Sequence, residues 1–219
     1  MRSLVIIPAY NAAASLPSLL PGVLKHAAAR DVLVVDDGST DGTAGTASAF
    51  DVLVVRQGTN AGKGEALERG FAHALLNGYD AVITIDADGQ HPPELLPRLL
   101  DRAAAGVYDV VIASRRRQFD MMRWERALSN RITTVVVALL AGVRIEDSQC
   151  GYRFISTSLL RRLSLSAGGF QAESELLIQA GRLGARIGHV ACGVRPGKIS
   201  HINHSVDTIR FICLCIRYL

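Results

Sequence analysis

The chain has 219 residues, enough for one sizeable domain with a buried core or for one domain with a small appendage. Hydrophobic residues make up 49% of the sequence, aromatic residues only 5%, and 20 residues are glycine, a composition that excludes a disordered protein and favours an aliphatic α/β protein over an all-β one. The net charge of +4 conceals two unlike halves: residues 1–100 hold 7 Lys and Arg against 11 Asp and Glu, a balance of −4, and residues 101–219 hold 17 against 9, a balance of +8.

The basic second half predicts an acidic partner. Phosphate groups of a substrate or an anionic membrane surface fit this charge. Nucleic acid is the weaker candidate, because aromatic side chains are few and acidic residues lie in the same domain. We therefore expect a phosphate-bearing ligand or a membrane and no nucleic acid.

The cysteines and the first residues indicate the compartment. Cys150, Cys192, Cys213 and Cys215 form no CxxC pair and no zinc-type spacing with histidine, so we expect reduced thiols that serve packing. The first apolar run ends at Pro8, too early for a signal peptide, and no apolar run reaches the ~18–20 residues that span a bilayer. We expect a cytoplasmic protein, peripheral on the cytosolic face of a membrane.

Six short apolar runs predict buried strands. They lie at residues 4–7, 32–35, 52–55, 81–85, 108–113 and 187–194. Helical segments separate most of them, the first beginning near Ser15, a residue type that favours the N-cap position. This alternation predicts a mainly parallel sheet with helices on both faces, in which ligands bind at the carboxyl ends of the strands.

Asp36 and Asp37 follow the second predicted strand directly. Two adjacent carboxylates at the carboxyl edge of a sheet favour contact with a nucleotide. Ser39, Thr40 and Asp41 come next, and these residue types suit either ligand binding or the capping and turn formation that the following helix requires.

A glycine-rich loop at residues 57–66 follows the third predicted strand. Its glycines let backbone N–H groups approach a ligand, Lys63 supplies a positive charge, and a helix begins at once, so an anionic group could bind at the N-terminus of that helix. The spacing is not that of a P-loop. The alternative is a solvated loop lysine without a ligand.

The fourth predicted strand ends in Asp86, Asp88 and Gln90. If the backbone stays extended, these alternate side chains point the same way and their oxygens converge on one hard cation. The alternative is an acidic turn closed by a helix that begins at Pro92 and Pro93, since Asp-Gly is ordinary turn chemistry.

The segment after the fifth predicted strand combines arginines with a helical apolar pattern. Arg115 follows the strand, and Arg131 lies within the pattern. Apolar side chains recur at helical spacing at Trp124, Leu128, Ile132, Val135 and Leu139. They predict either a core helix or an interfacial helix with its apolar face in lipid and its arginines at the headgroups.

The last third of the chain adds further charged groups. Asp147 and Arg153 flank a glycine before an apolar segment, and Glu173 and Glu175 open a later helix, where acids also suit the helix dipole. A basic loop at residues 195–204 contains Lys198 and His201 and is of the kind that closes over phosphates. Residues 205–219 predict a short amphipathic helix that carries Arg210 and Arg217.

Six motifs in this order resemble glycosyltransferase family 2, with the GT-A-type nucleotide-sugar fold, and within it the dolichyl-phosphate mannose synthases and polyprenyl-phosphate sugar transferases. The motifs are residues 7–11 (IPAYN), 35–43 (VDDGSTDGT), 60–64 (NAGKG), 86–94 (DADGQHPPE), 147–154 (DSQCGYRF) and 170–175 (FQAESE). The string at 86–94 is the most specific to the lipid-phosphate branch. The resemblance implies a Rossmann-like, mainly parallel sheet and an amphipathic interfacial helix at about 121–142, in a GT-A domain of residues 1–200 followed by an amphipathic segment of residues 201–219.

The resemblance also implies roles for the matching residues. Pro8, Tyr10 and Asp36 would contact the nucleobase and ribose, with Asp37 and Lys63 nearby, and Asp86 would contact the ribose or sugar. Asp88 and Gln90 would hold Mg²⁺ or Mn²⁺ against the diphosphate. Arg115 and Arg131 would gather the acceptor phosphate, Arg153 would lie near the same charges, and Lys198 and His201 would cover the donor. Ala12 replaces the acid that often follows Tyr-Asn in the family, which removes any donor contact made by that acid.

The expected reaction is inverting transfer of a sugar from a nucleotide diphosphate sugar, GDP-mannose or a UDP-hexose, to dolichyl or undecaprenyl phosphate. A phosphate acceptor is already ionised, whereas a hydroxyl acceptor would require a base such as Asp147 or Glu173. Three alternatives stay open: transfer to a saccharide or protein hydroxyl, a non-catalytic nucleotide-sugar-binding protein, and a nucleotidyltransferase. A membrane protein partner could complete the acceptor site.

Overall fold

The computed structural model describes residues 1–105, 107–116, 124–166, 169, 171–193 and 204–219. Within these residues, seven strands form one sheet in the order β3-β2-β1-β4-β6-β5-β7. The strands are β1 Ser3–Ala9, β2 Val32–Asp36, β3 Leu53–Arg56, β4 Ala81–Thr84, β5 Val110–Ser114, β6 Arg153–Ser156 and β7 Ile187–Ala191. All neighbours pair in parallel except at β6, which is antiparallel to both β4 and β5.

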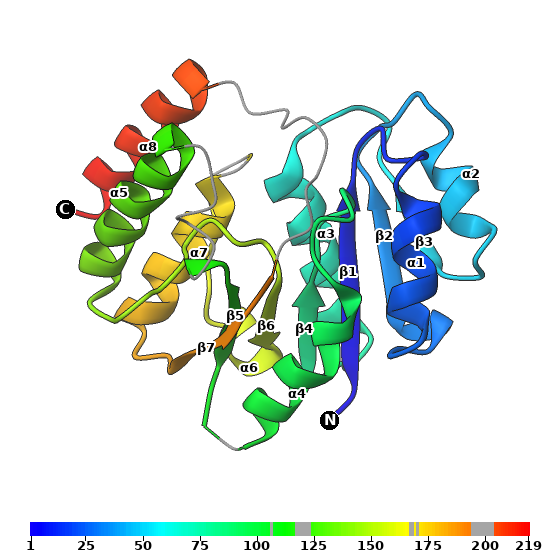
Figure 1. The fold of residues 1–219 in the computed structure, drawn as a ribbon, viewed down its shortest axis with the longest axis horizontal. Coiled ribbons are helices and arrows are strands. Elements are labelled where there is room, and N and C mark those ends of the chain that lie inside the picture. Colours follow the sequence, from blue (N-terminus) through cyan, green and yellow to red (C-terminus); the bar gives the residue numbers. More distant parts are fainter. Residues whose placement is uncertain (106, 117–123, 167–168, 170, 194–203) are drawn as a thin grey trace.

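Helices cover both faces of this sheet (Figure 1). They are α1 Leu16–Leu24, α2 Thr43–Ser48, α3 Lys63–Leu76, α4 Leu96–Ala104, α5 Trp124–Ala141, α6 Thr157–Leu160, α7 Gln171–Arg182 and α8 His204–Arg217, with short 3₁₀ turns η1 Ala29–Asp31 and η2 Pro93–Leu95. On one face α1 contacts η2, which leads into α4, and on the other α3 contacts α7. Both α5 and α8 pack on α7, outside the sheet layer.

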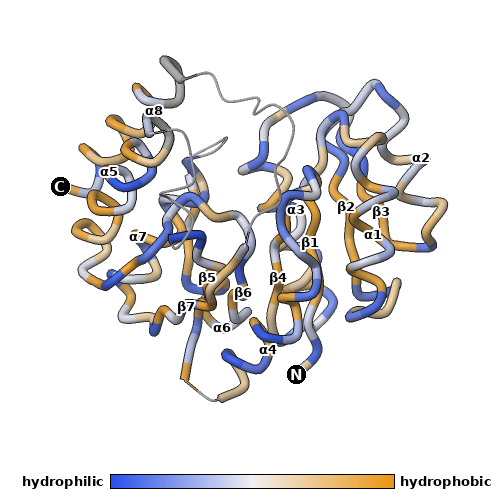
Figure 2. The backbone as a smooth tube through the Cα atoms, viewed as in Figure 1, coloured by the Kyte–Doolittle hydropathy of each residue, from blue (hydrophilic) through white to orange (hydrophobic). Residues whose placement is uncertain are grey.

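The predicted α/β fold is confirmed, and so are all six predicted strands. Buried aliphatic side chains of the strands form the centre of the core, and hydrophobic residues run along β1 and β2 in Figure 2. Strand β6 was not predicted, because only Phe154 and Ile155 lie between a polar loop and a helix, and its partners come from distant segments. Ser15 occupies the N-cap of α1, but its hydroxyl donates to the Ala12 carbonyl instead of capping the helix.

The apolar stripe predicted on α5 faces outward. Trp124 is 72% exposed and Leu139 75%, and Leu128, Ile132 and Val135 between them are also exposed. The core interpretation of this stripe is therefore wrong: the opposite face of α5 makes the contacts with α7, through small residues such as Ala141, which a Cβ at Gly181 would overlap. Helix α8 likewise exposes Ile209, Ile212 and Ile216. Among the described residues, no helix combines the length and apolarity that crossing a membrane requires.

Candidate active site

The candidate site lies at the carboxyl edge of the sheet, where the loops after β1, β2, β3 and β4 meet. The first two loops are joined by side chains that accept backbone N–H groups. Asn11 donates its N–H to the Ser39 hydroxyl at 2.9 Å, and Ala13 donates to an Asp41 carboxylate oxygen at 3.0 Å. Asp41 also accepts from the N–H of Thr43, so it supports the start of α2 as well. The turn interpretation thus holds for Asp41, whereas the N-cap of α2 is Gly42 without a side-chain cap, and Ser39 fixes the neighbouring loop.

Asp36 and Asp37 differ in what they bind. Asp36 is buried, accepts the Ser39 N–H at 2.9 Å, and lies 3.6 Å from the guanidinium Nε of Arg56. Asp37 accepts the N–H groups of Ala61 and Gly62, both at 2.8 Å, and so holds the loop after β3. Their contact with a nucleotide stays a prediction, because each carboxylate already stabilises the loops around the site.

Glycine is required where these loops touch. Gly38 has φ +70°, and a Cβ on it would lie 2.5 Å from the carbonyl carbon of Thr59. Pro8 is buried within β1, whereas Tyr10 is 42% exposed beyond the end of the strand. Of the predicted base and ribose contacts, Tyr10 is thus the side chain most open to a ligand.

Lys63 is a half-buried bridge between two carboxylates, with its side chain 17% exposed. Its Nζ lies 2.5 Å from Asp86 Oδ1 and 3.0 Å from Glu173 Oε2. Burial lowers the pKa of Lys63, but the two carboxylates outweigh burial and hold that pKa well above its ordinary value. The solvated-lysine alternative is therefore wrong. The charge expected to face a diphosphate is largely compensated, and Lys63 joins the start of α3 to β4 and α7.

Gly151 packs directly against the side chains of Asp86 and Lys63. A Cβ at Gly151 would lie 2.6 Å from Asp86 Oδ2 and 2.9 Å from Lys63 Nζ, so a larger residue there would displace the atoms of this ion pair. The hydroxyl of Thr84 donates to the Gly151 carbonyl at 2.6 Å and fixes this approach. Burial raises the pKa of Asp86, but Lys63, with smaller effects from His91 and Arg115, outweighs burial, so the pKa lies below its ordinary value.

The extended backbone on which convergence of Asp86, Asp88 and Gln90 depended is absent. Strand β4 ends at Thr84, Gly89 has φ +71°, and Asp88 accepts the N–H of Gln90 at 2.9 Å in a turn. Asp86 thus faces Lys63, while Asp88 is exposed and Gln90 is half-buried. The acidic-turn interpretation is correct for the backbone.

The donor set at this turn still fits a hard divalent cation. A carboxylate at Asp88 and an amide oxygen at Gln90 are ligand types that Mg²⁺ accepts, and Mg²⁺ usually takes its other ligands from water and substrate phosphates. In the described part of the chain, no group of three His, Cys, Asp or Glu side chains is arranged to hold a metal ion. Most ligands of a cation at this turn would therefore come from the substrate and water.

Arg115 and Asp147 form a buried fork. Nε and Nη2 of Arg115 donate to the two Asp147 carboxylate oxygens at 2.8 and 3.0 Å, and the Arg115 backbone N–H adds a third hydrogen bond at 3.0 Å. Burial raises the pKa of Asp147, but Arg115 outweighs burial and lowers it overall. Arg131 lies exposed on α5, and its proximity to Arg115 stays a prediction.

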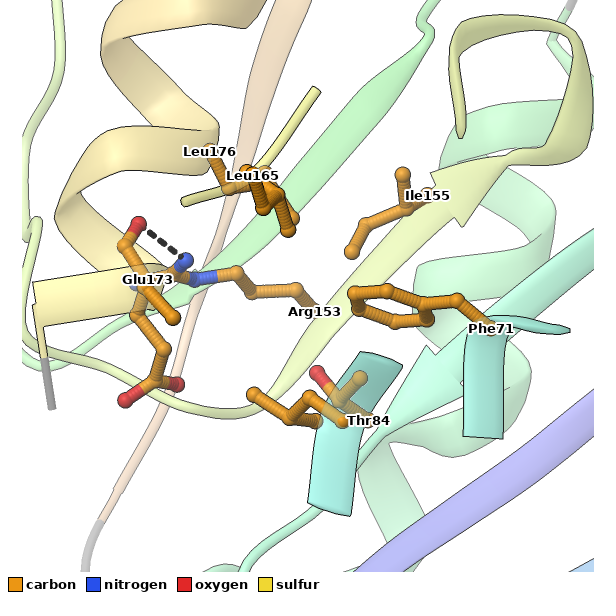
Figure 3. Close-up of a pocket in the computed structure, with 9 residues that line it drawn as sticks. Phe71, Thr84, Arg153, Ile155, Leu165, Glu173 and Leu176 are labelled. Atoms are coloured by element: carbon orange, nitrogen blue, oxygen red, sulfur yellow. Dashed lines mark hydrogen bonds between the residues drawn. The ribbon is translucent and has the colours of Figure 1, made fainter. Parts of the chain in front are cut away.

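Arg153 is fully buried and binds only backbone in the contacts seen here. Its Nε, Nη1 and Nη2 donate to the carbonyls of Cys150, Glu173 and Ser148 at 2.7, 2.9 and 2.8 Å. Figure 3 shows the side chain passing from β6 to Glu173 on α7. Its expected place near the charges of the substrate stays a prediction, and in the structure Arg153 holds the loop before β6 through these bonds. Lys198 and His201 lie outside the described residues.

Sequence reasoning missed two residues at this edge. Arg56, at the end of β3, lies beside Asp36, and its signal was its position directly after a predicted strand. His91 is buried and lies 3.8 Å from Asp86 through its Nε2. It stands inside the motif at 86–94, but only tertiary contacts distinguish it from a turn residue.

Comparisons with known proteins agree with this geometry. Residues 4–168 match the family Glycosyl transferase family 2. Undecaprenyl-phosphate mannosyltransferase of Micrococcus luteus is 38% identical over 198 residues, covering 85% of this chain and 81% of the relative. Polyprenol monophosphomannose synthase of Mycolicibacterium smegmatis is 39% identical over 176 residues, covering 76% of this chain and 66% of the relative.

A solved structure with a similar fold is glucosyl-3-phosphoglycerate synthase from Mycobacterium tuberculosis in complex with uridine diphosphate. It matches with a TM-score of 0.78 at 26% identity, covering 99% of this chain and 79% of the other. A second structure of that enzyme contains Mn²⁺, uridine diphosphate and phosphoglyceric acid and matches with a TM-score of 0.77. The expected GT-A-type fold is confirmed. The chain belongs to glycosyl transferase family 2 and is a glycosyltransferase.

Proposed function

We propose that this glycosyltransferase moves a sugar from GDP-mannose or a UDP-hexose to a polyprenyl phosphate at the cytosolic face of a membrane, with inversion at the anomeric carbon. An oxygen of the acceptor phosphate attacks the anomeric carbon. The bond from that carbon to the diphosphate oxygen breaks, and nucleoside diphosphate leaves. The two relatives named above, which by name act on undecaprenyl phosphate and make a polyprenol monophosphomannose, support this reaction.

The observation that carries this choice is that the two carboxylates named as bases for a hydroxyl acceptor are both engaged in ion pairs. Asp147 is fully buried in the fork with Arg115, which lowers its pKa, and Glu173 is paired with Lys63. A carboxylate held ionised in this way is a poor general base. A phosphate acceptor needs none, because its oxygen is already ionised near neutral pH.

Different residues of the chain bind the donor and the acceptor. Tyr10 and Asp36, with Asp37 supporting the adjoining loop, form the donor base and ribose subsite, and Asp86 borders the sugar. A divalent cation held by Asp88 and Gln90 would neutralise charge on the leaving diphosphate. On the acceptor side, Arg131 supplies positive charge for the acceptor phosphate, and Arg115, oriented by Asp147, positions it.

The exposed apolar faces of α5 and α8 support contact with a membrane. Both faces lie outside the sheet layer, and exposed Arg131, Arg210 and Arg217 lie on the same two helices. A helix with an apolar face and basic side chains binds the interface of an anionic bilayer. We place polyprenyl phosphate at this side because its lipid tail would stay in that bilayer.

The test is incubation of purified protein with radiolabelled GDP-mannose or UDP-glucose, Mn²⁺, and vesicles containing polyprenyl phosphate. We expect organic-extractable label that falls at least ~100-fold in Asp88→Ala. Asp101→Ala, at an exposed acid on α4, is the matched control and should retain activity. Label found only in water-soluble products would contradict the proposal in favour of a saccharide acceptor. Release of diphosphate from a nucleoside triphosphate and a sugar phosphate would instead indicate a nucleotidyltransferase.

A further inference from the structure

His91 is a buried side chain with a different contact on each side of its ring. Its Nε2 lies 3.8 Å from Asp86 Oδ2 and 3.9 Å from Cys150 Sγ, and its Nδ1 lies 3.8 Å from Cys192 Sγ. The ring also packs against Tyr152, with centroids 5.7 Å apart. One imidazole thus contacts the segment after β4, the segment before β6 and the end of β7.

These contacts place His91 at one end of the turn that carries Asp88 and Gln90. Asp86 anchors the other end through its ion pair with Lys63 at 2.5 Å. Between the two anchors, Asp88 is exposed, and among the described residues only the Asp88–Gln90 hydrogen bond closes the turn. The position of the turn relative to the sheet is therefore set at its ends.

The surroundings of His91 suit a fixed imidazole and exclude a zinc site. The two thiols face different ring nitrogens, so they cannot share one metal ion with the same nitrogen. Burial raises the pKa of Cys150 to about 12, which keeps its thiol neutral. The Cys192 thiol donates to the Gly193 carbonyl at 3.3 Å, and its sulfur lies 3.8 Å from His91 Nδ1.

We propose that His91 is a positioning residue: by tying the 86–91 turn to Cys150 and Cys192, it holds Asp88 and Gln90 at the spacing that a divalent cation with a nucleoside diphosphate requires. This inference rests on the proposed function, because it takes the cation to bind at that turn. Residues that orient metal ligands without touching the metal commonly change metal affinity about 10- to 100-fold when they are replaced.

The test is Mn²⁺ binding in the presence of GDP or UDP, measured by the electron paramagnetic resonance signal of free Mn²⁺. We expect His91→Phe, which keeps the ring and removes both nitrogens, to weaken Mn²⁺ binding about 10-fold. His91→Gln, which restores one polar group, should recover part of that loss. The melting temperatures of the variants separate this effect from loss of the fold.

Tyr152→Phe is the matched control, because it removes the hydroxyl that contacts the Pro93 carbonyl and keeps the ring against His91. We expect it to bind Mn²⁺ as the unaltered protein does. A folded His91→Phe with unchanged Mn²⁺ affinity would overturn the positioning role alone. If His91→Phe does not fold, Cys192→Ala takes its place, and unchanged affinity there overturns the role equally. If the unaltered protein fails to bind Mn²⁺ both with GDP and with UDP, the proposed function is overturned as well.

Discussion

Side-chain acceptors hold the loops after β1, β2 and β3 in place. Side-chain donors do so in the segments around β5, β6 and α7. On the first side, side-chain oxygens accept backbone N–H groups, as Asp37 does from Ala61 and Gly62. On the second side, buried arginines donate, as Arg153 does to three carbonyls and Arg115 to Asp147. This difference matches the −4 and +8 charge balances of the two parts of the sequence.

Substitutions on the two sides should lower the free energy of unfolding by different amounts. A buried guanidinium serves several acceptors at once, so its loss leaves several buried groups without a partner. Asp37, an acceptor on the first side, serves two N–H groups of a partly exposed loop, so its loss should be smaller. Substitutions should therefore be most costly on the arginine side.

Arg153→Met gives the largest expected effect. It leaves the carbonyls of Ser148, Cys150 and Glu173 buried without their donor, at about 1 kcal/mol or more each, so about 3 kcal/mol or more of unfolding free energy should be lost. Urea denaturation measures this loss. Arg98→Met, at an exposed position on α4, should change stability by less than about 0.5 kcal/mol. A loss below about 1 kcal/mol at Arg153 would contradict the larger cost expected for the buried arginines.

Asp147→Asn should cost about 2–3 kcal/mol at pH 7, because Arg115 loses a buried partner. The pKa of Asp147 is lowered from 3.8 in the folded protein, so its contribution to stability is present above pH 3.8 and is lost as the pH falls through the folded pKa. Urea denaturation between pH 3 and pH 7 should show the difference from unaltered protein shrinking in acid. A difference independent of pH would contradict the ion pair as its source, and exposed Asp101→Asn is the control.

Asp37→Asn should cost less, about 1–2 kcal/mol, because an amide oxygen can replace only one of two acceptors. Hydrogen exchange at the amides of Ala61 and Gly62 should become faster, while exchange in α7 stays unchanged. A loss as large as that of Arg153→Met would remove the distinction between the two sides.

Leu139→Glu should leave stability within about 0.5 kcal/mol, because the side chain is 75% exposed. On the proposed membrane face, it should reduce sedimentation with phosphatidylglycerol-containing vesicles about 10-fold, since burying a Leu side chain in lipid is worth about 1.5–3 kcal/mol. Leu76→Glu, 87% exposed at the end of α3, is the matched control and should bind vesicles normally. Equal losses in both variants would contradict a specific face.

Local patterns were sufficient for six of the seven strands in the described residues and for where the polar groups gather. Runs such as residues 4–7 and 32–35 are apolar throughout, as strands covered on both faces are, and turn residues follow them at once. The position of Lys63 at the start of α3 was also predicted. Its pairing with Asp86 and Glu173 was not, because Glu173 lies 110 positions further along the chain.

Short motifs and hydrophobic period are enough to establish the α/β class, the carboxyl-edge position of the charged groups and the resemblance to the family. Which charges meet was settled by the tertiary structure. It turned Arg153 onto carbonyls, closed the Asp88 turn, inserted β6 antiparallel between β4 and β5, and faced the apolar stripe of α5 outward. Each of these depends on partners far apart in the chain, and the energy of a buried charge or an apolar face is set by what lies against it.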